Sequence, residues 1–319
     1  MIVAASQSPD LPVLDRLWST YGSGRRARYT RLAGRSRRVY LCEPASGLGL
    51  VVRLAADGRS RFPVEAAVVQ RLRDLDVPVP EIRFVGGVET DSGTIAAMVQ
   101  ERAVGRTLRN YAEASDLDDA HVATARAGEV LHCIHQVRTA CFGSLDPDLR
   151  GTHDAFAAWF IDAVEPKAAQ ALEIAPEAAG PVKAAMELLA AHRDLLDACE
   201  SSLVHGDFSP DNILVDDAGR VSAVLDWEAV KSGPPDLDIG WWDCFFESPG
   251  TPAVALLRGY ADPAFAASAR LRTIRHLTVL RVMIGHFSWC VASGATDGAV
   301  MAEQRLTREW ETAEFWRAD

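Results

Sequence analysis

Short apolar runs separated by polar or glycine-containing turns dominate the first hundred residues of the chain. Residues 29–32, 39–42 and 48–54 have the length and the residue types of β-strands. A fourth run, at residues 94–100, is typical of an inner strand. Residues 65–72 instead carry apolar side chains at helical spacing. The pattern predicts a β-rich unit that contains one amphipathic helix.

Helical periodicity replaces this pattern in the rest of the chain. Apolar residues recur every three or four positions from residue 118 to residue 137, and residues 156–196 carry further helical segments that prolines interrupt. Residues 276–290 are apolar but contain Arg281 and two histidines, so they predict a buried helix rather than a membrane span. We therefore expect an α+β chain whose second part is mostly helical.

A polar block with candidate chemistry lies inside this helical part. It reads His-Gly-Asp-Phe-Ser-Pro-Asp-Asn over positions 205–212, and two apolar runs joined by a polar turn follow it. These runs, residues 213–215 and 221–225, predict a β-hairpin. The glycine and the proline of the block predict a bent loop, in which Asp207 is free to point toward an acceptor hydroxyl.

The expected register of the hairpin brings two oxygen ligands together. If Val215 faces Val221, then Asn212 faces residue 224, and Asp226 is its diagonal neighbour on the same face. Diagonal side chains in a hairpin lie roughly 7–8 Å apart and can converge on one ion. Two such ligands suit Mg²⁺, which keeps part of its water shell and takes further ligands from phosphates. We therefore expect this pair to hold Mg²⁺.

An Asp, an Asn five residues later and a second Asp after a hairpin form the arrangement of the phosphoryl-transfer template. The His-Gly-Asp form, with Asp-Trp at positions 226–227, resembles the aminoglycoside phosphotransferase family of small-molecule kinases. The resemblance implies a bilobal protein-kinase-like fold, with a nucleotide-binding lobe over residues 1–102 and a catalytic and acceptor-binding lobe over residues 103–319. It also implies ATP or GTP as co-substrate, Mg²⁺, and a small-molecule hydroxyl as acceptor.

The same resemblance implies roles in the nucleotide-binding lobe. Arg53 stands where protein kinases have the lysine that grips the phosphates, and this lobe contains no lysine at all. The planar guanidinium suits phosphate oxygens, but Arg and Lys are not interchangeable at such a site. Glu65 is the expected partner of Arg53, and the alternative is a solvated glutamate in the first turn of a helix.

The nucleotide base is expected between the lobes, where the backbone of a hinge would hold it. The resemblance places that hinge at Gln100, Glu101 and Arg102. Met98 either lines the adenine pocket or belongs to the core. Ser36, in the loop after the first strand, would contact the phosphates.

Two polar residues are expected to support the catalytic loop from behind. His205 would brace the loop, and Asp238 would tether it. His135 has the character of a structural histidine, since a lone helical histidine is more often a satisfied core group than a ligand.

Charge is distributed unevenly between the two lobes. Up to residue 103 the chain has 15 Arg and 11 acidic residues, a net charge of +4; the rest has 18 basic and 33 acidic residues, a net charge of −15. The strong negative charge of the second lobe argues against a nucleic-acid partner and would attract a cation. The alternative is that this charge only keeps the surface solvated. We therefore expect a cationic antibiotic such as an aminoglycoside as acceptor, and thus a role in antibiotic resistance. The candidate carboxylates near the catalytic elements are Asp211, Glu228, Asp243 and Glu247.

Other acceptors and one other protein class stay open at this point. The aromatic residues between positions 241 and 246, together with Trp289, favour a bulky, less charged acceptor such as a macrolide. The resembled family also phosphorylates peptide antibiotics, sugars and amino alcohols. A non-catalytic pseudokinase that binds nucleotide is the alternative class, and the arginine at position 53 is its only support.

Composition limits the cellular setting. The six cysteines are scattered and form neither a C-x-x-C pair nor a zinc-ligand spacing. We find no membrane-spanning run and no signal-peptide pattern. The sequence therefore predicts a cytoplasmic protein with free thiols, as a monomer or a homodimer.

Overall fold

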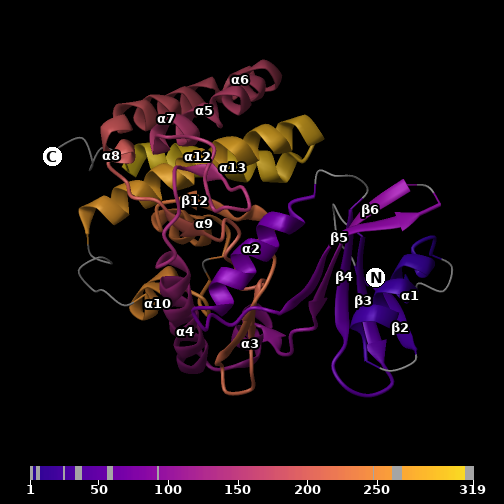
Figure 1. The fold of residues 1–319 in the computed structure, drawn as a ribbon. Helices are drawn as coiled ribbons and strands as arrows, with labels where there is room; N and C mark the ends of the chain where they lie inside the picture. Colours follow the sequence, from indigo (N-terminus) through magenta and orange to yellow (C-terminus); the bar gives the residue numbers. More distant parts are fainter. Residues whose placement is uncertain are drawn as a thin grey trace.

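A six-stranded antiparallel sheet forms one side of the molecule, in the order β1-β2-β3-β4-β6-β5 (Figure 1). The computed structural model describes residues 3–4, 8–23, 26–32, 38–55, 60–91, 93–246, 248–260 and 268–312. The strands of the sheet are β1 (Val3–Ala4), β2 (Ala27–Leu32), β3 (Arg38–Pro44), β4 (Leu50–Ala55), β5 (Ile82–Thr90) and β6 (Gly93–Glu101). The strands expected from the apolar runs correspond to β2, β3, β4 and β6.

Helix α1 (Leu11–Tyr21) packs against this sheet. Its buried Leu14 and Trp18 form an apolar cluster with Tyr40 and Val52 of the central strands. Burying side chains from both elements in one cluster supplies the main stabilisation of this lobe.

Helix α2 (Phe62–Arg73) connects the two lobes rather than completing the sheet's own core. Its buried Val68 and Leu72 belong to the same apolar cluster as Phe208 and Trp227 of the catalytic region. In Figure 1 it lies between the sheet and the helices. Because α2 carries Glu65, its packing holds this carboxylate near both lobes.

The rest of the described chain is mostly helical, as expected. Its helices are α3 (Leu108–Ala114), α4 (Leu117–His135), α5 (Phe156–Asp162), α6 (Glu165–Ile174), α7 (Ala179–Ala191), α8 (Arg193–Asp197), α9 (Asp236–Phe245), α10 (Ala253–Gly259), α12 (Ala269–Ser293) and α13 (Thr296–Thr312), with short 3-10 turns η1 (Pro176–Ala178) and η2 (Trp227–Ala229). The buried helix predicted over residues 276–290 lies within α12, which packs against α6, α9 and α13. No described helix combines the length and the apolar character that crossing a membrane requires.

Two small three-stranded sheets hold the catalytic region. One has the order β11-β10-β7 and the other the order β8-β12-β9. Their strands are β7 (Arg106–Thr107), β8 (Gly143–Ser144), β9 (Ser202–Val204), β10 (Ile213–Val215), β11 (Val221–Val224) and β12 (Lys231–Gly233). The loop that carries Asp207 therefore starts from one small sheet and ends in the other.

Candidate active site

The catalytic loop turns sharply at Gly206. Its φ is +82°, and a Cβ atom there would lie 2.3 Å from the carbonyl oxygen of Ala229, so glycine is required. The Asp238 carboxylate at the start of α9 accepts hydrogen bonds from the backbone N–H groups of His205 and Gly206, both at 2.8 Å. Asp238 thus makes the contacts expected of a tether for the loop.

Asp238 is itself held by the histidine expected to be structural. His135 Nε2 lies 3.0 Å from Asp238 Oδ2, and its Nδ1 lies 2.5 Å from the Tyr260 hydroxyl. Burial opposes ionisation of Asp238, but the hydrogen bond and the positive charge that His135 offers outweigh it, so the pKa of Asp238 is lowered. A charged carboxylate is thus kept behind the loop.

His205 braces the loop through both ring nitrogens. Nδ1 accepts from the backbone N–H of Asp207 at 3.2 Å, so Nε2 carries the proton and donates to the Leu225 carbonyl at 2.8 Å. Burial lowers the pKa of His205, which favours this neutral form. His205 thus makes the contacts expected of a brace, and it joins the loop to the far end of the hairpin.

Asp207 is held by two side-chain donors. Its Oδ1 accepts from the indole Nε1–H of Trp241 at 2.9 Å, and its Oδ2 accepts from the Asn212 amide at 3.1 Å. Burial raises the pKa of Asp207, and these bonds only partly offset that rise. A raised pKa strengthens a carboxylate as a base near neutral pH. Trp241 was expected only as part of an aromatic run, because its donor role depends on the orientation of α9.

The hairpin has a register that its sequence pattern did not predict. Val215 lies opposite Val221 as expected, but Ile213 lies opposite Val224, because the register shifts by one residue within the hairpin. The backbone N–H of Leu225 consequently donates to the Asn212 carbonyl at 2.8 Å. The expectation that residue 212 faces residue 224 is therefore wrong. A one-residue bulge causes the shift.

Diagonal pairing with Asn212 across the hairpin therefore does not account for the position of Asp226. Its backbone is left-handed, with φ 60° and ψ 68°, a conformation that redirects its side chain at the end of the hairpin. Asn212 uses its amide nitrogen on Asp207, which turns its amide oxygen to the opposite side. Within the described chain, no group of three or more His, Cys, Asp or Glu side chains is arranged to hold a metal. The pair Asn212 and Asp226 stays a prediction as a metal site.

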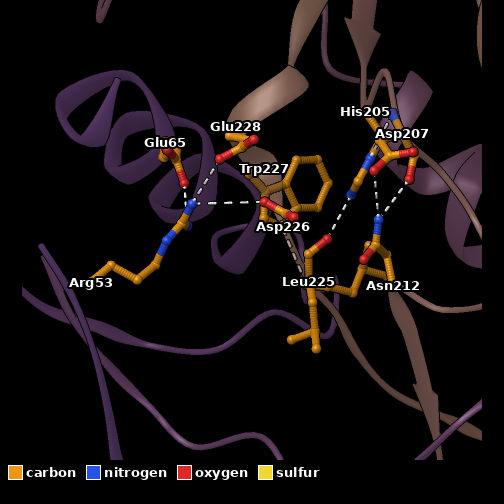
Figure 2. A network of polar contacts seen from close by, with 10 residues as sticks. Arg53, Glu65, His205, Asp207, Asn212, Leu225, Asp226, Trp227 and Glu228 are labelled. Atoms are coloured by element: carbon orange, nitrogen blue, oxygen red, sulfur yellow. Dashed lines mark hydrogen bonds and ion pairs between the residues drawn. The ribbon is translucent and has the colours of Figure 1, made fainter. Parts of the chain in front are cut away.

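Arg53 joins the lobes through three carboxylates, as Figure 2 shows. Its Nη1 lies 2.6 Å from Glu65, so the expected partnership is confirmed, and both side chains are buried. Its Nη2 lies 3.3 Å from Glu228 and 3.7 Å from Asp226. Three carboxylates therefore lie around one guanidinium.

Some backbone groups of the expected hinge, residues 100–102, are already hydrogen-bonded to other backbone groups of the protein. The backbone N–H groups of Glu101 and Arg102 donate to the carbonyls of Glu81 and Gly49, at 2.8 and 3.0 Å. A base bound here would have to use carbonyl groups or the N–H groups that follow Arg102. Met98 pairs with Arg53 across the strands β4 and β6 and is 1% exposed, which fits its core role. Ser36 and Glu247 lie outside the described residues.

Each described candidate carboxylate for a cationic acceptor is paired with an arginine. Asp211 receives two hydrogen bonds from Arg109, at 2.7 and 2.8 Å. Asp243 is paired with Arg275, with 2.7 Å between Oδ2 and Nε. Glu228 is paired with Arg53, as described above. These carboxylates are therefore already engaged with cations of the protein.

A pocket of about 280 Å³ lies close to Asp207, through a wall residue that donates to this carboxylate. One of its walls is Trp241, the residue whose indole donates to Asp207. The other side chains that characterise it come from α6, α9 and α12: Lys167, Phe245, Arg281, His286 and Trp289. None of the described residues that line it is acidic. A second cavity, of about 450 Å³, lies behind the loop near His135 and is separate from the Asp207 carboxylate.

The geometry agrees with what comparisons with known proteins show. A family model for the phosphotransferase enzyme family matches residues 29–272. The chain belongs to this family. Hygromycin-B 4-O-kinase of Escherichia coli is 25% identical to this phosphotransferase over 266 residues, which cover 81% of this chain and 73% of the relative. The protein is accordingly a small-molecule phosphotransferase, and the family recognised from the His-Gly-Asp block is confirmed.

Solved structures support the fold of the phosphotransferase over nearly its whole length. A thermostable mutant of aminoglycoside phosphotransferase APH(4)-Ia, in a ternary complex with ADP and hygromycin B, has a TM-score of 0.71 at 21% identity, over 93% of this chain and 97% of that chain. A macrolide 2′-phosphotransferase from Brachybacterium faecium has a TM-score of 0.57 at 20% identity, over 92% of this chain and 97% of that chain. The expected α+β fold is confirmed.

Proposed function

We propose that this phosphotransferase transfers the terminal phosphoryl group of ATP or GTP to a hydroxyl of a small molecule, with Asp207 as the base. The acceptor oxygen forms the new P–O bond, the bond to the leaving nucleoside diphosphate breaks, and the hydroxyl proton goes to Asp207. The observation that carries this proposal is the Asp207 carboxylate, which two donors orient beside an open pocket. The ADP in a structural relative agrees with a nucleotide co-substrate.

We infer that Arg53 and its carboxylates serve the nucleotide side of the reaction. Glu65 orients the guanidinium, which would then contact phosphate oxygens. Asn212 and Asp226 would hold Mg²⁺, because amide and carboxylate oxygens are the ligands that suit this ion. When bound, Mg²⁺ supplies positive charge that offsets the charge of the phosphates.

For the acceptor, we infer a bulky molecule that depends little on positive charge. Hygromycin-B 4-O-kinase is a relative, which keeps an aminoglycoside acceptor as a candidate and with it a role in antibiotic resistance. Against a cationic acceptor, Asp211, Glu228 and Asp243 are engaged with arginines. The aromatic wall beside Asp207 favours the alternative of a less charged acceptor, such as a macrolide.

A turnover screen with an Asp207→Asn control tests the proposed function. ADP or GDP release is measured with Mg²⁺ and a panel of aminoglycosides, macrolides, peptide antibiotics, sugars, amino alcohols and hydroxy acids. We expect one class to be phosphorylated and Asp207→Asn to lose transfer by at least about a hundredfold, while it still binds Mg²⁺–nucleotide. Near-normal turnover by Asp207→Asn would refute the assigned base. Nucleotide binding without transfer to any acceptor would favour the pseudokinase.

A further inference from the structure

Two positively charged side chains line the pocket beside Trp241, and a third lies against the loop that carries Asp207. Lys167 of α6 and Arg281 of α12 line the pocket. Lys231 of β12 lies against Gly206, because a Cβ atom at that glycine would lie 2.5 Å from the lysine Nζ, and the next residue is Asp207. The chain has only three lysines, so two of them are found here.

None of these cations is paired with an acid in the part of the chain that the structure describes. Arg281 donates from Nε to the Phe160 carbonyl at 2.8 Å and lies over the Trp159 ring at 4.5 Å. These contacts orient the guanidinium without neutralising it. Asp162 and Glu165, the acids nearest in sequence to Lys167, are exposed and do not line the pocket.

The charge of Arg281 acts on both lysines. Burial, and then the charge of Arg281, lower the pKa of Lys167. The same two causes lower the pKa of Lys231 to about 8, although Asp238 and Asp207 act in the opposite direction. Burial lowers the pKa of Arg281 to about 10. Partly buried like charges are unfavourable together, and a bound anion would remove that penalty.

Flat apolar surfaces stand next to this positive charge. Trp289 is 55% exposed and stacks on His286, with 5.9 Å between ring centroids and 27° between ring planes. Trp241 and Phe245, which also line the pocket, form an edge-to-face pair with 4.8 Å between ring centroids. An exposed tryptophan in a pocket offers a ring a large stacking surface.

We propose that the acceptor is an anionic hydroxy compound with a flat apolar part. Its carboxylate or phosphate pairs with Lys167 and Arg281, its ring stacks on Trp289, and its hydroxyl reaches Asp207 past the indole of Trp241. This inference rests on the proposed function, because it takes Asp207 as the base for that hydroxyl. The strongly acidic net charge of the lobe does not oppose it, because none of the described residues that line the pocket is acidic.

The first test measures binding with two fluorescent molecules that share one ring system. 1-Anilinonaphthalene-8-sulfonate is anionic, and N-phenyl-1-naphthylamine is neutral. Both are titrated into the full-length protein, into Lys167→Glu, and into Lys183→Glu as a matched control. Lys183 is the exposed lysine of α7 and does not line the pocket.

The proposal requires that only the anion respond to the charge in the pocket. Lys167→Glu is expected to weaken sulfonate binding about tenfold, since charge reversal replaces an attraction by a repulsion. The neutral compound should bind this variant unchanged, and Lys183→Glu should bind both compounds like the unaltered protein. Undiminished sulfonate binding by Lys167→Glu, or an equal loss of both compounds, would overturn the proposal.

The second test measures turnover on three compounds that carry an anionic, a neutral or a cationic group. 3-(Hydroxymethyl)benzoate, its carboxamide and 3-(hydroxymethyl)benzylamine share a ring and a hydroxyl. The carboxylate should have a kcat/KM at least about tenfold above the other two, and Lys167→Glu should abolish that preference. Preference for the amine or the amide would overturn the anionic acceptor and leave the kinase assignment intact. If no compound in this set or in the wider screen is phosphorylated, the kinase assignment fails, while the sulfonate titration still decides whether the pocket binds anions.

Discussion

Replacing Trp241 with Phe tests how strongly one hydrogen bond affects the pKa of the Asp207 carboxylate. The substitution keeps most of the aromatic wall and removes the Nε1–H donor, which lies 2.9 Å from Asp207 Oδ1. This bond lowers the pKa of Asp207 against the rise that burial causes, so its loss should raise that pKa further. Asn212 still donates to Oδ2, and the loop should therefore keep its place.

The size of the effect follows from the strength of the lost bond. A hydrogen bond to a charged group contributes about 1.5–3 kcal/mol, and we take the lower value because Asp207 is only partly buried. Since 1.36 kcal/mol corresponds to one pH unit, the acidic limb of kcat/KM should move up by about one pH unit. At a pH below this limb kcat/KM should fall about tenfold, and above it the loss should be small.

The assay is a pH profile of kcat/KM with saturating Mg²⁺–nucleotide and the acceptor found by the turnover screen. Trp289→Phe is the matched control, because Trp289 also lines the pocket but makes no contact with Asp207. Its acidic limb should coincide with that of the unaltered protein. A folded Trp241→Phe protein whose acidic limb has not moved would refute the reasoning, as would a downward movement.

Two further substitutions test the other supports of the site. Asp226→Ala should weaken Mg²⁺-dependent nucleotide binding by at least about tenfold. The control is Asp217→Ala, in the exposed turn of the same hairpin, which should bind Mg²⁺–nucleotide like the unaltered protein. A magnesium titration that Asp226→Ala leaves unchanged would contradict the metal assignment. Asp238→Asn should lower the free energy of unfolding by about 3 kcal/mol, because it breaks a fully buried pair with His135 and removes a charged acceptor from two backbone N–H groups. Denaturant titration measures the loss, and a change below about 1 kcal/mol would argue that the tether is unimportant.

Some hypotheses rested on residues close together in the chain, and these largely hold. The strands and helices follow from the spacing of apolar residues, which depends on local geometry alone. The block from His205 to Asn212 predicts the family, which the family model confirms. Its residues are consecutive, so their spacing in the sequence fixes how they follow one another in a loop in front of a hairpin. The pair of Arg53 and Glu65 was expected from family resemblance, and its 2.6 Å contact bears it out.

The sequence alone could not indicate the charge of the acceptor. A net charge of −15 counts carboxylates but does not say which of them have partners. Asp211 and Asp243 are neutralised by Arg109 and Arg275, which lie 102 and 32 positions away in the chain. Such pairs form only when segments far apart in the chain pack together, so a composition argument could not exclude these acids from the acceptor site.

What the sequence alone determined was therefore the family and the two kinds of secondary structure, and it also indicated the residues that we propose carry the chemistry. Only the tertiary structure decided the register at Asn212, because a bulge leaves the alternation of apolar residues almost unchanged. Only the packing of α6, α9 and α12 brought Lys167, Trp241 and Arg281 to one pocket. The physical reason is that backbone propensity acts over a few residues, whereas the surroundings of a side chain depend on segments far away in the chain.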